Sequence, residues 1–235
     1  MKNELWVLGI CLTVMTAAIL AGCFVPSQPA AFYGRDSEYT FVLDAGHGGE
    51  DGGALSESGI KESDINLSVV LRLDQLMGFC GKKTLLVRSE DISIHDPSST
   101  TLREKKVSDL HNRAALVEGT DRALLVSIHQ NSYPDSRYSG AQVFYGSAAG
   151  AQGWGECAQE ILRSVLNPEN RRAAKPVPDT VYLMNHITCP GILVECGFLS
   201  NREEAAQLLT DSYQKQLALA LTGVCCSASQ LALIT

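Results

Sequence analysis

The sequence lacks several features by which common classes of protein are recognised. Acidic residues outnumber basic ones by 26 to 19, so no broad basic surface is available for a phosphate backbone, which argues against nucleic-acid binding. No internal repeat or low-complexity tract is evident. Of the eight cysteines, two lie within the first 25 residues, and the others show no Cys-x-x-Cys metal spacing. We interpret these others as small apolar core residues rather than as a disulfide framework.

Charged side chains are also scarce, at 19% of the 235 residues, whereas 45% are hydrophobic. This composition supplies enough apolar material for one well-packed core, and the length is too short for two large domains. We therefore expect one folded domain.

Charge is absent altogether from residues 5–25, which follow Lys2. An apolar segment of this length predicts a signal anchor or signal peptide over residues 1–25, followed by a linker over 26–38. Both forms place the domain outside the cytoplasm, either membrane-anchored or secreted. The letters LAGC, which end at Cys23, are also similar to a lipoprotein signal, in which Cys23 would carry a lipid anchor.

Beyond the linker, apolar runs of strand length alternate with stretches of helical periodicity. The predicted strands are 40–44, 84–88, 124–129, 142–145 and 192–195, and the predicted helices are 63–77, 110–117, 155–165, 203–209 and 213–224. This alternation predicts an α/β fold in which helices flank a twisted, mostly parallel or mixed sheet. We place the domain at residues 39–226 and a tail at 227–235.

The loop at 43–53 sets one histidine, His47, among five glycines. Because glycine lets a backbone turn tightly and approach a ligand, His47 is expected to face a ligand rather than pack in the core. Loops beyond strand ends are where α/β folds bind ligands. The loop has neither the Gly-Lys-Ser/Thr ending of a P-loop nor the spacing of a dinucleotide fingerprint, so we discount both.

A second histidine, His129, closes another predicted strand. Because the ends of parallel strands meet at one edge of a sheet, His47 and His129 can converge on one cation. Catalytic zinc often takes two histidines and one glutamate, and Glu62, at the start of the next helix, is a candidate for the third ligand. An acidic residue in the first helical turn is also favoured by the helix dipole alone. The residues by themselves leave both interpretations open.

A third group of residues is the apolar strand that ends in Glu195. Glutamate is rarely buried unless it is paired or lies near a metal, so its position at the end of such a strand needs a reason. One reason is a general base that takes a proton from metal-activated water. The other is a structural, ion-paired glutamate. Position alone does not separate the two.

Together these stretches resemble the zinc-dependent N-acetylmuramoyl-L-alanine amidases of the AmiC-like catalytic family, from about residue 39 to 224. The family pattern is Asp-x-Gly-His-Gly-Gly-x-Asp-x-Gly, a glutamate at the first helix, Ser-Ile-His-x-Asn and Val-Glu-x-Gly-Phe-Leu-Ser-Asn, and all four parts are present in order. The resemblance implies one Zn²⁺ ion bound by His47, Glu62 and His129. It implies that Glu195 is the catalytic carboxylate.

The resemblance also implies hydrolysis of the amide bond between the lactyl group of N-acetylmuramic acid and L-alanine in peptidoglycan. Arg113 and Asn131, which match family positions, are expected to support the site or bind substrate. In its small size and in the sequence of residues 171–186, the chain is similar to the spore-cortex members of the family. That likeness implies muramic-lactam formation, a muramic-acid deacetylase acting on the product, and a location at the forespore envelope.

Two other interpretations remain open. A zinc peptidase that cuts within the peptide stem would use the same metal set, and His47 and Glu50 have the bare His-x-x-Glu spacing of zinc carboxypeptidases. A non-catalytic wall-binding protein that kept the fold is the other. The sequence does not favour it, because all four metal and catalytic positions hold competent residues.

Overall fold

The structure is a computed structural model that describes residues 39–231, which belong to one compact unit. The signal anchor or signal peptide predicted at 1–25 and the linker predicted at 26–38 lie outside the described residues. Within the described range, none of the helices has both the length and the apolar character needed to cross a bilayer.

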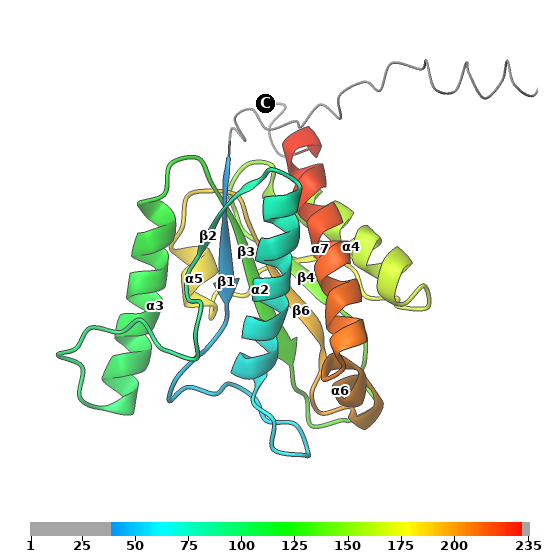
Figure 1. Ribbon diagram of the computed structural model, residues 1–235, viewed down its shortest axis with the longest axis horizontal. Coiled ribbons are helices and arrows are strands. Elements are labelled where there is room, and N and C mark those ends of the chain that lie inside the picture. Colours follow the sequence, from blue (N-terminus) through cyan, green and yellow to red (C-terminus); the bar gives the residue numbers. More distant parts are fainter. Residues whose placement is uncertain (1–38, 232–235) are drawn as a thin grey trace, which may run out of the picture. The chain divides into compact units, whose positions relative to one another are not determined.

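A six-stranded mixed sheet forms the centre of the fold, in the order β2-β1-β3-β6-β4-β5 (Figure 1). Strands β2, β1, β3 and β6 run parallel, β4 is antiparallel to β6, and β5 is parallel to β4. The strands are β1 (Thr40–Ala45), β2 (Lys83–Leu86), β3 (Ala123–Asn131), β4 (Gln142–Tyr145), β5 (Lys175–Pro176) and β6 (Gly191–Phe198).

Helices cover both faces of this sheet, as Figure 1 shows. They are α2 (Glu62–Phe79), α3 (Leu102–Glu118), α4 (Ala151–Leu166), α5 (Tyr182–Asn185), α6 (Arg202–Leu208) and α7 (Asp211–Leu231). Helices α2, α4, α6 and α7 enclose the larger core with one face of the sheet, and α3 and α5 enclose the smaller core with the other. The predicted single α/β domain with a mixed sheet is therefore confirmed.

The structure differs from the predicted elements where the apolar periodicity is weak or where the residues are polar. Helix α3 begins at Leu102 rather than at 110, because Thr101 and Glu104 form a capping box ahead of a polar first turn. The short elements α5 and β5 were not expected. Helix α7 continues to Leu231, so residues 227–231 of the expected tail are helical, and Ala228 is buried.

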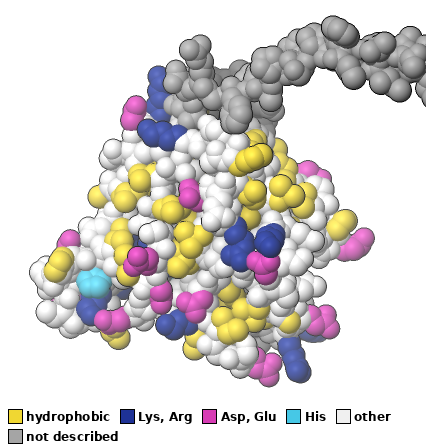
Figure 2. Space-filling model, in the orientation of Figure 1, with side chains coloured by type: hydrophobic (Ala, Val, Ile, Leu, Met, Phe, Trp, Pro, Cys, Tyr) yellow, Lys and Arg dark blue, Asp and Glu magenta, His cyan; other side chains and the backbone are white. Residues whose placement is uncertain are grey.

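The six cysteines of the described range form no disulfide with one another, and their burial differs. Cys196 and Cys225 are buried, as expected for small apolar core residues, whereas Cys80 is exposed. On the face of the domain that Figure 2 shows, acidic and basic side chains are interspersed among hydrophobic ones.

The alternation of side chains along the strands decides which residues face the smaller core. Because successive side chains point to opposite faces, Ser127 and His129 of β3 share the face of Leu125. In β6, Glu195 shares the face of Leu193 in the same way. His129 and Glu195 are also partners in register. Their side chains therefore lie side by side at the carboxyl ends of neighbouring parallel strands.

Candidate active site

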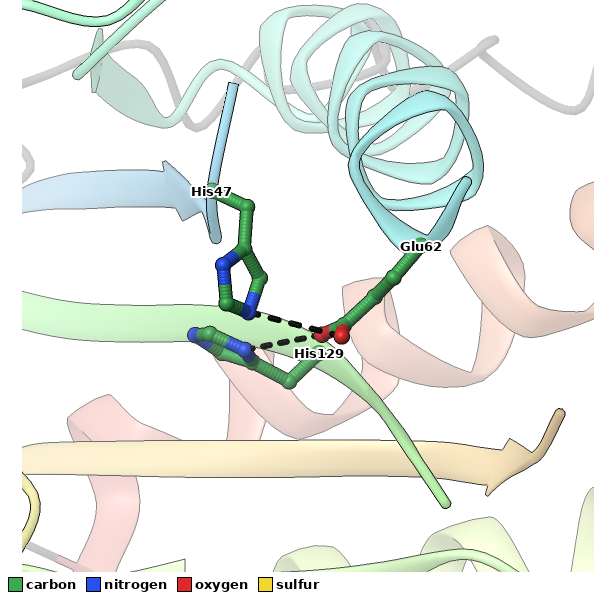
Figure 3. Close-up of side chains that lie close together, drawn as sticks. All are labelled: His47, Glu62 and His129. Atoms are coloured by element: carbon green, nitrogen blue, oxygen red, sulfur yellow. Dashed lines mark hydrogen bonds and ion pairs between the residues drawn. The ribbon is translucent and has the colours of Figure 1, made fainter. Parts of the chain in front are cut away.

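Three potential metal ligands meet at the carboxyl edge of the parallel strands (Figure 3). His47 lies in the loop after β1, Glu62 is the first residue of α2, and His129 lies near the end of β3. One candidate ligand atom from each residue lies within 4.8 Å of the other two. The structure thus brings together the three residues that the sequence nominated.

The geometry of this group suits a single small cation. Glu62 Oε2 lies 3.4 Å from His47 Nε2, and Glu62 Oε1 lies 3.0 Å from His129 Nδ1. The two imidazole rings are 5.1 Å apart at their centroids in an edge-to-face arrangement. Two imidazole nitrogens and one carboxylate form a ligand set that catalytic zinc uses, with a fourth position left for water or substrate. The donor set present here therefore fits zinc.

Asp51 fixes the orientation of the His47 ring. Its Oδ2 lies 3.0 Å from His47 Nδ1, which leaves Nε2 to face the site. A carboxylate behind a metal-binding imidazole sets its tautomer and raises its basicity. Burial by itself would lower the pKa of His47, but the hydrogen bonds to Asp51 and Glu62 together raise it to about 9. Lys106 pairs with Asp51 at 3.1 Å on the outer side.

Glu62 is buried and held by backbone donors. Its Oε2 accepts a hydrogen bond from the amide of Ala54 at 2.9 Å, and its Oε1 accepts one from the amide of Gln130 at 3.0 Å. Asn66, one turn further along α2, donates to Oε1 at 3.3 Å. Burial would raise the pKa of Glu62, but the two histidines hold it well below its usual range. Glu62 is thus a fixed anion, as a metal ligand has to be.

Two glycines make room for the side chains of the three candidate ligands. A Cβ at Gly46 would lie 2.2 Å from His129 Cε1, so the ring of His129 packs over a position where no side chain fits. Gly53 has φ +70, and a Cβ there would lie 2.6 Å from Glu62 Oε2 and 2.7 Å from His47 Cδ2. The glycines of this loop therefore serve close approach as well as turning.

His47 itself has a strained backbone, with φ 62 in the left-handed region that disfavours residues other than glycine. Arg113, from α3, stabilises this conformation by donating to the carbonyls of His47 at 2.7 Å and Ala45 at 3.0 Å. The guanidinium also pairs with Asp44, and its Nε donates to Asp109 at 2.6 Å. Because Arg113 is only 2% exposed, this network links α3 to the loop from inside the protein.

Glu195 lies in the same cavity as His47 and His129, a space of about 220 Å³ walled by α3 and by residues 180–183. Its Oε2 is buried and has no hydrogen-bond partner among the described residues. Burial raises the pKa of Glu195 to about 6, although the positive charge of His129 opposes the shift. A carboxylate with an unused oxygen and a pKa near neutrality is suited to exchanging a proton with a bound molecule.

Other residues considered from the sequence lie further from the cavity. Asn131 lies outside the cavity lining, and its carbonyl accepts from the amide of Leu199 at 2.8 Å, which joins β3 to the end of β6. Glu50 is exposed and paired with Lys105, so it does not form a His-x-x-Glu pair with His47. The sequence reasoning missed the supporting residue Asp51, although it belongs to the glycine-rich motif.

Comparison with known proteins gives this geometry its context. Residues 41–224 match the family model described as N-acetylmuramoyl-L-alanine amidase. The chain belongs to this family. It is therefore an amidase acting on peptidoglycan, as the sequence motifs predicted.

The relatives agree with this assignment. The amidase is 35% identical, over 75% of its own length and 73% of the relative's, to the germination-specific N-acetylmuramoyl-L-alanine amidase of Bacillus subtilis. Its fold is similar to that of the CwlD amidase from Clostridioides difficile, solved in complex with the GerS lipoprotein, with 36% identity and a TM-score of 0.78. That similarity covers 82% of this chain and 98% of the other. An N-acetylmuramoyl-L-alanine amidase from Clostridium difficile 630 gives a TM-score of 0.71 at 25% identity, over 82% and 97% of the two chains.

Proposed function

We propose that this amidase is a zinc enzyme in which His47, Glu62 and His129 bind one Zn²⁺ and Glu195 is the general base. The convergence of the three ligands beside Glu195 is the observation that carries this proposal. Both arrangements that the sequence left open, a Glu62 that serves the helix dipole alone and an ion-paired structural Glu195, are less consistent with these contacts. Glu62 faces two histidines, and Glu195 has an unpaired buried oxygen.

The bond to be cut joins the lactyl carbonyl of N-acetylmuramic acid to the nitrogen of L-alanine. Zinc, when bound, supplies Lewis-acid chemistry by polarising this carbonyl and acidifying a water molecule. Glu195 accepts the proton of the attacking water and delivers it to the departing alanine nitrogen. Asp51 keeps the His47 ring in the tautomer that the site needs, and Arg113 holds the loop that presents the ring.

For the biological setting, we propose action on the spore cortex in muramic-lactam formation. The similarity to a germination-specific amidase supports this proposal. Removal of the stem leaves a free lactyl carboxyl on muramic acid, which a muramic-acid deacetylase would prepare for ring closure. The domain would work outside the cytoplasm, at the forespore envelope, anchored by residues 1–25 or by a lipid on Cys23. A lipoprotein partner, of the kind that accompanies the C. difficile relative, belongs to the same proposal.

The decisive experiment is mass spectrometry of the products released from purified peptidoglycan, with zinc and with a chelator. Intact stems that begin at L-alanine, released only with zinc, are the expected products. Shortened stems would instead establish a peptidase, and binding without release would establish a wall-binding protein.

A variant separates the base from the ligands. Glu195→Gln is expected to lower turnover by roughly 10²- to 10⁴-fold, the usual contribution of a general base, while the zinc content stays at the wild-type value. Glu203→Gln, an exposed change at the start of α6, is the matched control and should retain activity. Loss of zinc from Glu195→Gln would show that Glu195 is a ligand rather than the base.

A further inference from the structure

Two exposed tyrosines lie in the loop between β3 and β4, at the edge of the sheet that carries the ligands. Tyr133 is 51% exposed and Tyr138 is 47% exposed. Their ring centroids are 4.9 Å apart in an edge-to-face arrangement, and the Tyr138 ring lies 6.2 Å from that of Phe198, the last residue of β6. We call these three rings the aromatic cluster.

Hydrogen bonds to the segment after β6 hold this loop in place. The amide of Tyr133 donates to Ser200 Oγ at 3.0 Å, and the side-chain amide of Asn201 donates to the carbonyl of Ser136 at 3.0 Å. The amide of Gly140 donates to Glu204 at 2.8 Å. The loop is thus fixed at its start, middle and end. Rings held in this way lose little conformational entropy when a ligand covers them, so their exposure favours binding.

The aromatic cluster borders the catalytic carboxylate. Phe198 and Glu195 both lie in the second half of strand β6, where Phe198 comes shortly after Glu195. The guanidinium of Arg172 lies over the Phe198 ring, 4.9 Å from its centroid. Arg172 also donates to Gln142, which is the partner of Glu195 in register on the neighbouring strand β4, so the guanidinium links the Phe198 ring to the strand pair that carries Glu195. A molecule bound at Glu195 therefore continues onto the cluster if it is long enough.

The substrate is a polymer of this kind. The lactyl group is an ether of the muramic acid ring, so the sugar lies only a few bonds from the scissile amide and the glycan strand passes directly beside the site. A pyranose ring presents a face of C–H bonds that packs on the negatively polarised face of an aromatic ring, and tyrosine hydroxyls bond to sugar hydroxyls. The peptide stem carries carboxylates, but the loop carries no net charge, since Asp135 pairs with Arg137. The charge of Arg172 beside Phe198 already acts on the carboxylates of Glu204 and Glu195. The neutral glycan is the better match.

We propose that Tyr133 and Tyr138 bind the glycan strand at sugars adjacent to the muramic acid whose stem is removed. The proposal rests on the proposed function of the neighbouring zinc site. It makes the loop between β3 and β4 a specificity element that distinguishes polymeric peptidoglycan from short muramyl peptides.

The test uses the full chain and the double variant Tyr133→Ala/Tyr138→Ala. The double variant is expected to raise KM for polymeric peptidoglycan by about tenfold, the effect of losing roughly two ring contacts, with little change in kcat. On muramyl dipeptide, which has one sugar, the difference from wild type is expected to disappear. The matched control is Phe79→Ala, an 86% exposed ring at the end of α2, far from the edge where α2 begins at Glu62. It should behave as wild type on both substrates.

A binding measurement separates this proposal from the proposed function. Chemically prepared, stem-free glycan strands should bind the Glu195→Gln protein, and the two alanine substitutions added to it should weaken that binding by a similar factor. An unchanged KM and unchanged glycan binding in the folded double variant would overturn the proposal. An equal loss on muramyl dipeptide would also overturn it, because the rings would then act within the site. If wild type releases no stems but still binds glycan through these rings, the proposed function fails and the glycan site stands.

Discussion

Replacing Arg113 with methionine is expected to destabilise the domain more than any surface substitution. The change keeps an unbranched side chain of similar length but removes every donor of the guanidinium. Asp44, 1% exposed, would retain only its hydrogen bond from Ser127, and Asp109 would retain those from Ser93 and the amide of Ile94. The carbonyl of His47 would lose its bond from Arg113 too, whereas the carbonyl of Ala45 would keep a hydrogen bond from Arg88 at 2.8 Å.

The magnitude follows from leaving buried charge without compensation. Removing one partner of a buried ion pair costs about 3–5 kcal/mol in the free energy of unfolding, which for a domain of this size lowers Tm by roughly 6–20 °C. Burial would raise the pKa of Asp44, but the positive charge of Arg113 helps to hold this pKa below its ordinary value. Without Arg113 the folded pKa rises above the unfolded value, so the loss of stability is largest at neutral pH and shrinks toward pH 4.

The assay is denaturant unfolding at pH 7 and pH 4, with zinc content as a second readout. Arg72→Met is the matched control, because Arg72 forms a partly exposed ion pair with Asp211 and its loss should cost below about 1 kcal/mol. The double variant Arg113→Met/Asp44→Asn should recover part of the loss. A cost for Arg113→Met no larger than that of Arg72→Met, or a cost independent of pH, would refute the reasoning.

Three further predictions concern the proposed zinc site. Asp51→Asn should weaken zinc binding by roughly 10- to 100-fold, measured by competition with a chromophoric chelator, because the carboxylate behind His47 is lost; an unchanged affinity would remove Asp51 from the support of the ligand. Gly46→Ala should abolish zinc binding in metal analysis, because a Cβ there overlaps the His129 ring, whereas Gly153→Ala, which meets open space on α4, should retain the ion. Apparent zinc affinity should rise about tenfold per pH unit up to about pH 9, because His47, whose pKa is raised to about 9 in the ion-free protein, must lose a proton to bind; calorimetry showing no proton release near pH 7 would contradict this.

The sequence was most informative where periodicity and motif coincided. The buried parallel strands read as apolar runs, and both histidines stood at their ends, so convergence at one edge followed from the rule for parallel sheets. Glu62 was harder, because a carboxylate in a first helical turn has an electrostatic explanation of its own. Its contacts with two histidines, which no local pattern predicts, favour a metal ligand over the helix dipole alone.

What the sequence did not predict depends on contacts between distant segments. The partner of Asp44 in the core is an arginine of α3, and no local pattern links those positions. Strand β5 has two residues, too few for any periodicity. Apolar periodicity did not predict the start of α3, because the first turns of this helix are polar; its signal is the capping box of Thr101 and Glu104.

The origin of the three candidate ligands also bears on how the chain matures. They come from the loop after β1, the start of α2 and the end of β3. Strands β1 and β3 pair with each other although α2, β2 and α3 separate them in sequence. An unfolded chain therefore has no local segment that holds the ion, and capture waits until the sheet is assembled. An ion that binds only the assembled state adds RT ln(1 + [Zn]/Kd), about 2.7 kcal/mol at a hundredfold excess over Kd. Zinc binding would then stabilise the domain only after it has folded. When zinc is scarce, folded molecules would lack this stabilisation and would be cleaved more readily by proteases.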